Sequence, residues 1–134
     1  MAFVAGAGRG IGRASAIALA QAGAEVWLAA RSQSEIEAAA AEIRSSGGRA
    51  HAVICDVTDT TATNQIIAAL PALDILVNNA GTNIRKQPQD YTLEEWRAVL
   101  DTNLTSAFLC SQAAYAAMVK GGGGKIINIG SMLS

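Results

Sequence analysis

The sequence is poor in the residues that mark several classes of protein. It has only two cysteines, Cys55 and Cys110, which lie far apart, so neither a disulfide framework nor a metal site is expected. No apolar run approaches the roughly 18–20 residues of a membrane-spanning helix, and no basic segment followed by an apolar one opens the chain. We therefore expect a cytoplasmic protein in which both cysteines are small buried apolar side chains.

Neither positive nor negative charge is in excess, with 10 lysines and arginines against 11 acidic residues. The net charge is −1 and no tract of basic residues is present, so the sequence lacks the features that attract nucleic acid or an anionic membrane. Of the 134 residues, 51% are hydrophobic and only 16% charged, which is typical of a globular chain and not of a disordered one. We expect one domain over residues 1–134, because no linker or repeat interrupts the pattern.

Short apolar runs alternate with segments of helical periodicity. The expected strands cover residues 2–5, 25–30, 49–55, 74–78 and 125–131. The expected helices cover residues 11–22, 34–45, 58–70 and, beyond a polar loop over residues 82–91, a pair that begins after Thr92, changes near residues 101–103 and ends around Lys120. This alternation predicts an α/β fold, a Rossmann-type doubly wound parallel sheet of strand order 3-2-1-4-5, with ligands bound at the carboxyl ends of strands 1 and 4.

A glycine-rich stretch, Ala5-Gly6-Ala7-Gly8-Arg9-Gly10-Ile11-Gly12, joins the first strand to the first helix. Its spacing is G-x-x-x-G-x-G, which matches neither the common G-x-G-x-x-G fingerprint nor the Walker pattern. Glycines allow a tight turn and a close ligand, and a helix start presents free N–H groups to an anion. The stretch predicts a dinucleotide site that includes Gly6, Arg9, Gly10, Ile11 and Gly12, and the alternative is an ordinary tight turn.

The residues after the second strand bear on the choice of cofactor. Folds of this kind that bind NAD usually place Asp or Glu there to hold the ribose 2′-hydroxyl, but this chain has Ala30 followed by Arg31. The guanidinium groups of Arg31 and Arg9 suit a 2′-phosphate, so NADP is favoured and NAD remains possible. The alternative is a solvated Arg31 that stacks on adenine without selecting a phosphate.

Polar residues also follow the third and fourth expected strands. Asp56 is expected to accept a hydrogen bond from the adenine amino group while Val57 covers the ring, and a helix cap is the alternative role for Asp56. The segment Asn78-Asn79-Ala80-Gly81 lies at the expected switch point. Of these residues, Asn79, Ala80 and Gly81 are predicted to contact the cofactor.

These stretches, together with Asn103-Leu104, Phe108 and Lys125-Ile126-Ile127-Asn128-Ile129-Gly130-Ser131, resemble the short-chain dehydrogenase/reductase family. The resemblance runs over nearly the whole chain, in order. It implies hydride transfer between NAD(P) and an alcohol or ketone, and a full-length form that is a homo-oligomer. One departure is Ala5, where the family usually has threonine.

The resemblance also implies catalytic roles for two residues. Asn103 matches the asparagine that helps to position a proton-relay water, and Ser131 matches the serine that steadies the substrate oxygen, whereas Ser134 lies outside the matching position. The family's Tyr-x-x-x-Lys pair, which supplies the general acid/base, lies roughly a dozen residues beyond the serine, and the sequence ends at Ser134, before that point. Tyr115 and Lys120 are not expected to replace it, because they are five residues apart and do not share a helix face. We therefore expect the N-terminal part of such an enzyme, truncated after the fifth strand, which binds cofactor without turnover.

The loop after the fourth strand gives an indication of the substrate. With the final residues of the chain, Thr82-Asn83-Ile84-Arg85-Lys86 resembles family members that oxidise sugar acids, such as gluconate 5-dehydrogenase and 2-deoxygluconate 3-dehydrogenase. Arg85 and Lys86 would then hold a carboxylate, and a solvated loop is the alternative. Two other functions stay open: reduction of a 3-oxoacyl thioester, and a non-catalytic NADP-binding module that works only with a partner chain.

Overall fold

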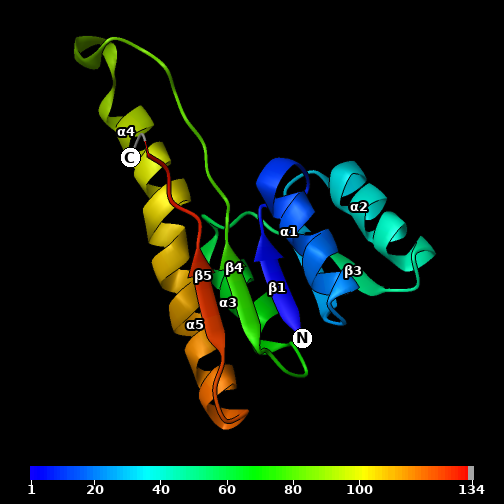
Figure 1. Ribbon diagram of the computed structural model, residues 1–134. Helices are drawn as coiled ribbons and strands as arrows, with labels where there is room; N and C mark the ends of the chain where they lie inside the picture. Colours follow the sequence, from blue (N-terminus) through cyan, green and yellow to red (C-terminus); the bar gives the residue numbers. More distant parts are fainter. Residues whose placement is uncertain (133–134) are drawn as a thin grey trace.

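The computed structural model describes residues 1–132 and has a single five-stranded sheet at its centre (Figure 1). Neighbouring strands pair in parallel in the order β3-β2-β1-β4-β5, which confirms the predicted topology. The strands are β1 (Ala2–Ala5), β2 (Glu25–Ala30), β3 (Arg49–Ile54), β4 (Ile75–Asn78) and β5 (Lys125–Asn128). The order reverses direction between β1 and β4, so their carboxyl ends form the switch point of the fold.

Helices cover both faces of the sheet because alternate strand residues point to opposite sides. The helices are α1 (Gly10–Gln21), α2 (Gln33–Ser45), α3 (Thr60–Ala68), α4 (Leu93–Leu100) and α5 (Ser106–Lys120), with a short 3-10 turn at Pro88–Asp90. Val4 and Leu28 pack with α1 and α2 in one core cluster. Phe3 and Leu76 pack with α3 and α5 in the other, which also buries both cysteines.

The helices begin and end at capping residues and glycines that can be recognised in the sequence. Gly23, with a φ of +97°, ends the turn after α1, and the side chain of Asp59 caps α3 by accepting a hydrogen bond from the Ala62 N–H. Thr92 and Glu95 form a capping box at the start of α4. These positions agree with the predicted helix starts and stops to within one or two residues.

Two expectations need correction at the ends of strands. The fifth strand was expected over residues 125–131, but β5 ends at Asn128, and the Ile129 N–H then donates to the Asn78 carbonyl. The third strand was expected over residues 49–55, but β3 ends at Ile54, so Asp56 is the second residue after it. In both cases the apolar run continues past the last paired residue, which is why periodicity alone overestimated the length.

The change of helix expected near residues 101–103 is a π-helical turn, Asp101–Thr105, between α4 and α5. A π-turn inserts an extra residue into the helical repeat and often marks a functional position. None of the helices within the described residues is long and apolar enough to cross a membrane.

Asn78, at the end of β4, joins three elements through its side chain. Its Nδ2 donates to Asn128 Oδ1 on β5 at 2.8 Å and to Ser111 Oγ on α5 at 3.1 Å. Its Oδ1 is buried and has no hydrogen-bond partner in residues 1–132. Ala5 on β1 is paired in register with Asn78, so its methyl group occupies the neighbouring position on the same face.

We expect Ala5→Ser to stabilise the protein by about 1 kcal/mol, because a hydroxyl next to Asn78 would satisfy the buried acceptor. Urea unfolding followed by circular dichroism measures the change in the free energy of unfolding. Ala7→Ser is the matched control: Ala7 is equally buried but packs in the apolar cluster of the opposite face, so its hydroxyl should destabilise. A loss of stability in both variants would contradict the expectation.

Candidate functional site

A pocket of about 1150 Å³ opens at the carboxyl edge of the sheet, where the chain leaves β1, β2, β3 and β4. Its walls include nearly all the residues that the sequence predicted to bind a cofactor. Those that line it are Gly6, Arg9, Gly10, Ile11, Arg31, Asp56, Val57, Asn79, Ala80 and Gly81. Gly12 lies behind the wall, where it is buried.

The glycine turn brings the start of α1 to this pocket. Gly6 and Gly10 have φ values of +70° and +57°, which lie in the left-handed region that residues with a Cβ rarely adopt. A Cβ at Gly12 would overlap the Gly6 carbonyl oxygen and Asn79 Nδ2, so only glycine allows α1 to approach the turn and β4 this closely. Arg9 precedes α1 without a side-chain hydrogen bond to its first amides, so these remain available to an anion.

Two cations lie at one end of the pocket. Arg9 and Arg31 are both exposed, and neither forms an ion pair with any residue from 1 to 132. Because neither guanidinium group is held in an ion pair, both are available to an anionic group of a ligand.

Asp56 supplies an acceptor in the same pocket. Its Oδ1 accepts hydrogen bonds from the hydroxyl and the N–H of Thr58 at 2.7 and 2.9 Å. These bonds, the hydroxyl first, hold the pKa of the Asp56 carboxyl below its usual range, and the positive charge of Arg31 adds to the effect. The carboxyl group stays ionised at neutral pH, and no bond to its Oδ2 is recorded in the described residues. The cap of α3 is Asp59, which excludes the helix-cap role considered for Asp56.

Asn79 and Asn103 tie the ends of the elements around the pocket together. Asn79 Nδ2 donates to the Gly6 carbonyl at 3.1 Å and so links β4 to the glycine turn. Asn103, in the π-helical turn, accepts from the Thr82 N–H at 2.7 Å and donates to the Thr82 carbonyl at 2.9 Å. The Asn103 side chain therefore bonds to the Thr82 backbone through both its oxygen and its amide nitrogen, and it holds the chain that leaves Gly81.

The residues considered for a catalytic role lie less close to the pocket than the predicted cofactor-binding residues do. Ser131 follows β5 on the same edge of the sheet but does not line the pocket. Ser134 lies outside the described residues. Tyr115 is exposed on α5 and Lys120 is in its last turn, remote from the carboxyl edge, as expected for residues without a catalytic role.

Several pocket residues were not predicted from the sequence: Gly8, Ala30, Ser32, Glu35, Cys55, Thr58, Ala98, Asp101 and Thr102. Ala98, Asp101 and Thr102 come from α4 and the π-helical turn, which reach the site only through the tertiary fold. Glu35 had one available signal, its position in the first helical turn after Arg31.

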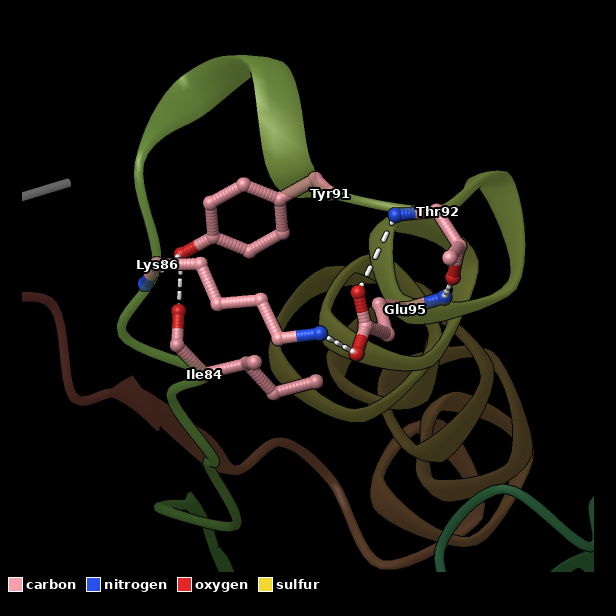
Figure 2. A network of polar contacts seen from close by, with 5 residues as sticks. All are labelled: Ile84, Lys86, Tyr91, Thr92 and Glu95. Atoms are coloured by element: carbon pink, nitrogen blue, oxygen red, sulfur yellow. Dashed lines mark hydrogen bonds and ion pairs between the residues drawn. The ribbon is translucent and has the colours of Figure 1, made fainter.

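The loop over residues 82–91 is fixed to α4 by the contacts drawn in Figure 2. The Tyr91 hydroxyl donates to the Ile84 carbonyl, and Lys86 Nζ forms an ion pair with Glu95. The Lys86 contact is also the first cause of the lowered pKa of Glu95. The neighbouring Arg85 is exposed and has no ion pair within residues 1–132, so of the two cations in the expected substrate loop only Arg85 carries an unmatched charge.

Comparison with known proteins gives consistent matches along the chain. A family model described as short chain dehydrogenase matches residues 1–134. The chain is 42% identical to a 3-oxoacyl-[acyl-carrier-protein] reductase of Synechocystis sp., covering 98% of this chain and 56% of that protein. It is 36% identical to gluconate 5-dehydrogenase of Gluconobacter oxydans, covering 99% and 54%.

Among solved structures, a gluconate 5-dehydrogenase from Burkholderia cenocepacia in complex with NADP and tartrate superimposes with a TM-score of 0.88 at 36% identity. That match covers 97% of this chain and 52% of the other. The chain therefore spans about half the length of the relatives that it matches.

The close approach of Gly12 to the Gly6 carbonyl and the Asn79 amide allows a test of the packing of the glycine turn. Gly12→Ala should destabilise the protein by about 3 kcal/mol, because the added methyl group meets backbone and the Asn79 amide, neither of which has room to move. Thermal and urea unfolding measure the loss. Ala14→Gly in the same helix is the control and should cost about 1 kcal/mol from propensity alone. An unchanged stability of Gly12→Ala would contradict the packing described here.

Proposed function

Because the chain belongs to the short-chain dehydrogenase family, we propose that it binds NADP(H) in the pocket at the carboxyl edge and forms the cofactor-binding part of an oxidoreductase. The observation that carries this proposal is the uncapped start of α1 facing the pocket, with the unpaired Arg9 and Arg31 beside it. A pyrophosphate and a 2′-phosphate are the groups that such an arrangement of amides and guanidinium groups favours.

In the proposed complex the pyrophosphate lies on the amides of Gly10, Ile11 and Gly12, above the bend at Gly6. Arg9 and Arg31 bind the 2′-phosphate, the free oxygen of Asp56 accepts from the adenine amino group, and Val57 covers the adenine ring. Asn79, Ala80 and Gly81 contact the ribose and nicotinamide side. When bound, NADP supplies the acceptor for a hydride, and the residues of this chain bind and orient it.

For the catalytic step we propose that Ser131 steadies the substrate oxygen and that Asn103 positions a water molecule for proton relay. The two hydrogen bonds between the Asn103 side chain and the Thr82 backbone support a positioning role, because they hold the π-helical turn against the chain that leaves Gly81. The 134 residues contain no Tyr-x-x-x-Lys pair, so we assign the role of general acid/base to none of them.

As substrate we propose a sugar acid of the gluconate class. The support is the exposed Arg85 on the loop that follows Gly81, together with the relatives that act on gluconate. Reduction of a 3-oxoacyl thioester is the second candidate, favoured by the 42% identity to the Synechocystis enzyme. A non-catalytic NADP-binding module remains the alternative for the chain by itself.

We further propose a cytoplasmic homo-oligomer. The free, buried cysteines fit a reducing compartment. Large apolar side chains are exposed along the π-helical turn and α5, at Leu104, Phe108, Tyr115 and Val119, and this stripe is suited to cover the same stripe of a second copy.

Arg31→Asp should raise the Kd for NADPH at least tenfold and the Kd for NADH less than threefold, since a charge-assisted contact to the 2′-phosphate contributes about 1.5–3 kcal/mol. Fluorescence titration of the purified protein measures both constants. Arg97→Asp is the control: Arg97 carries the same charge on α4 but does not line the pocket, so neither Kd should change appreciably. Equal losses for both nucleotides in Arg31→Asp would overturn the assignment of NADP.

Arg85→Gln should weaken the binding of gluconate to the NADP-loaded protein about tenfold, whereas Lys86→Gln should weaken it less than twofold. The difference follows from the ion pair that Lys86 forms with Glu95, which leaves Arg85 as the available partner for a carboxylate. Isothermal titration calorimetry in the presence of NADP measures both values. A larger effect at position 86 than at position 85 would contradict the proposed substrate contact.

A further inference from the structure

A carboxylate lies at the same end of the pocket as the two arginines. Glu35, in the first turn of α2, folds over Gly8 of the glycine turn: a Cβ built on Gly8 would be 2.8 Å from Glu35 Oε2 and 3.1 Å from Glu35 Cβ. The same Cβ would be 3.6 Å from the methyl group of Ala30, the last residue of β2. Gly8 and Ala30 are small, and together they leave the space that the Glu35 side chain occupies.

The carboxylate of Glu35 is not used by its own helix. Ser32 and Glu35 have the S-x-x-E spacing of a capping box, and Thr92 and Glu95 with T-x-x-E spacing do form one at the start of α4. At α2 no side-chain cap is made, and Ser32 Oγ instead lies 3.3 Å from Ser34 Oγ. Glu35 has no hydrogen bond or ion pair within the described residues, so its carboxylate is available to a ligand.

The position of Glu35 supplies what the end of β2 lacks. A carboxylate near this point accepts a hydrogen bond from the ribose 2′-hydroxyl in folds that bind NAD, and here Ala30 occupies the strand end. Glu35 reaches the same corner from the following helix and lines the same pocket as Arg9 and Arg31.

We infer that Glu35 is a specificity-determining residue that accepts a hydrogen bond from the 2′-hydroxyl of NAD(H) and opposes the 2′-phosphate of NADP(H). Glu35 and the pair Arg9 and Arg31 act in opposite directions at one position of the ligand, so the protein binds both dinucleotides. This inference rests on the proposed function, because it concerns the same pocket.

The experiment measures the Kd values for NADH and NADPH by fluorescence titration of the wild-type protein and of Glu35→Ala, Glu35→Gln and Glu37→Gln. In Glu35→Ala, NADH should bind about threefold to tenfold more weakly and NADPH about threefold more tightly, so the preference shifts about tenfold or more. Glu35→Gln removes the charge but keeps an acceptor oxygen, so it should retain most NADH affinity and still gain NADPH affinity. This gain should shrink at high salt, which screens charge repulsion.

Glu37→Gln is the control because Glu37 lies on α2 and pairs with Arg44, away from the pocket. It should leave both constants unchanged. A second route to the same effect is Gly8→Ala, whose methyl group would displace Glu35 and should also shift the preference toward NADPH, but not when added to Glu35→Ala.

A role of Glu35 in stability alone would change both constants by the same factor, and that result would overturn the inference while leaving the proposed function intact. So would an unchanged preference in Glu35→Ala with a folded far-ultraviolet circular dichroism spectrum. Failure of the wild-type protein to bind either nucleotide would overturn the proposed function, and the inference with it.

Discussion

The contact on which the site depends is the close approach of Gly12 to the Gly6 carbonyl and to the Asn79 side chain. It brings the start of α1 down onto the bend after β1 and ties both to the end of β4 through the Asn79 hydrogen bond. Because β1 and β4 are neighbours at the switch point, this contact also fixes where the open amides of α1 lie. The part of the pocket wall that the glycine turn forms is thus a consequence of backbone packing.

The elements were largely predictable because they rely on local signals. The glycine at position 23, the cap at Asp59 and the capping box at Thr92 each act within a few residues, so the sequence contains all the information that sets them. The ends of β3 and β5 were less predictable, because the last paired residue depends on the neighbouring strand and not on the apolar run itself. Ile129 shows this: it continues the apolar pattern of β5 but is joined to the sheet by one hydrogen bond only.

Contacts between side chains that are distant in the sequence could not be predicted either, because they too depend on the tertiary fold. Lys86 and Arg85 are adjacent cations in one polar loop, and nothing local distinguishes them. The structure does, because the folding of the loop onto α4 places Lys86 against Glu95 (Figure 2). Arg85 stays exposed. Glu35 and Glu95 offer a similar comparison. Each lies three positions after a hydroxyl residue, yet of the two only Glu95 completes a capping box. Gly8, which lies before α1 and β2 in the chain, leaves the space that the Glu35 side chain occupies, and no local capping rule indicates this contact.

These observations separate affinity from selectivity in the pocket. The glycine turn and the start of α1 are backbone, partly buried and held by tight contacts, and backbone amides bind a pyrophosphate whatever the rest of the nucleotide carries. Arg9, Arg31 and Glu35 are exposed side chains that contribute nothing to either core cluster. Since surface substitutions away from the core change stability little, these three positions can be altered to favour one nucleotide or the other without disturbing the turn. In the proposed complex the choice of cofactor is therefore set by a few exposed charged side chains around a phosphate site made of backbone, and we expect that it can change while the strand order, the bend and the pocket stay as they are.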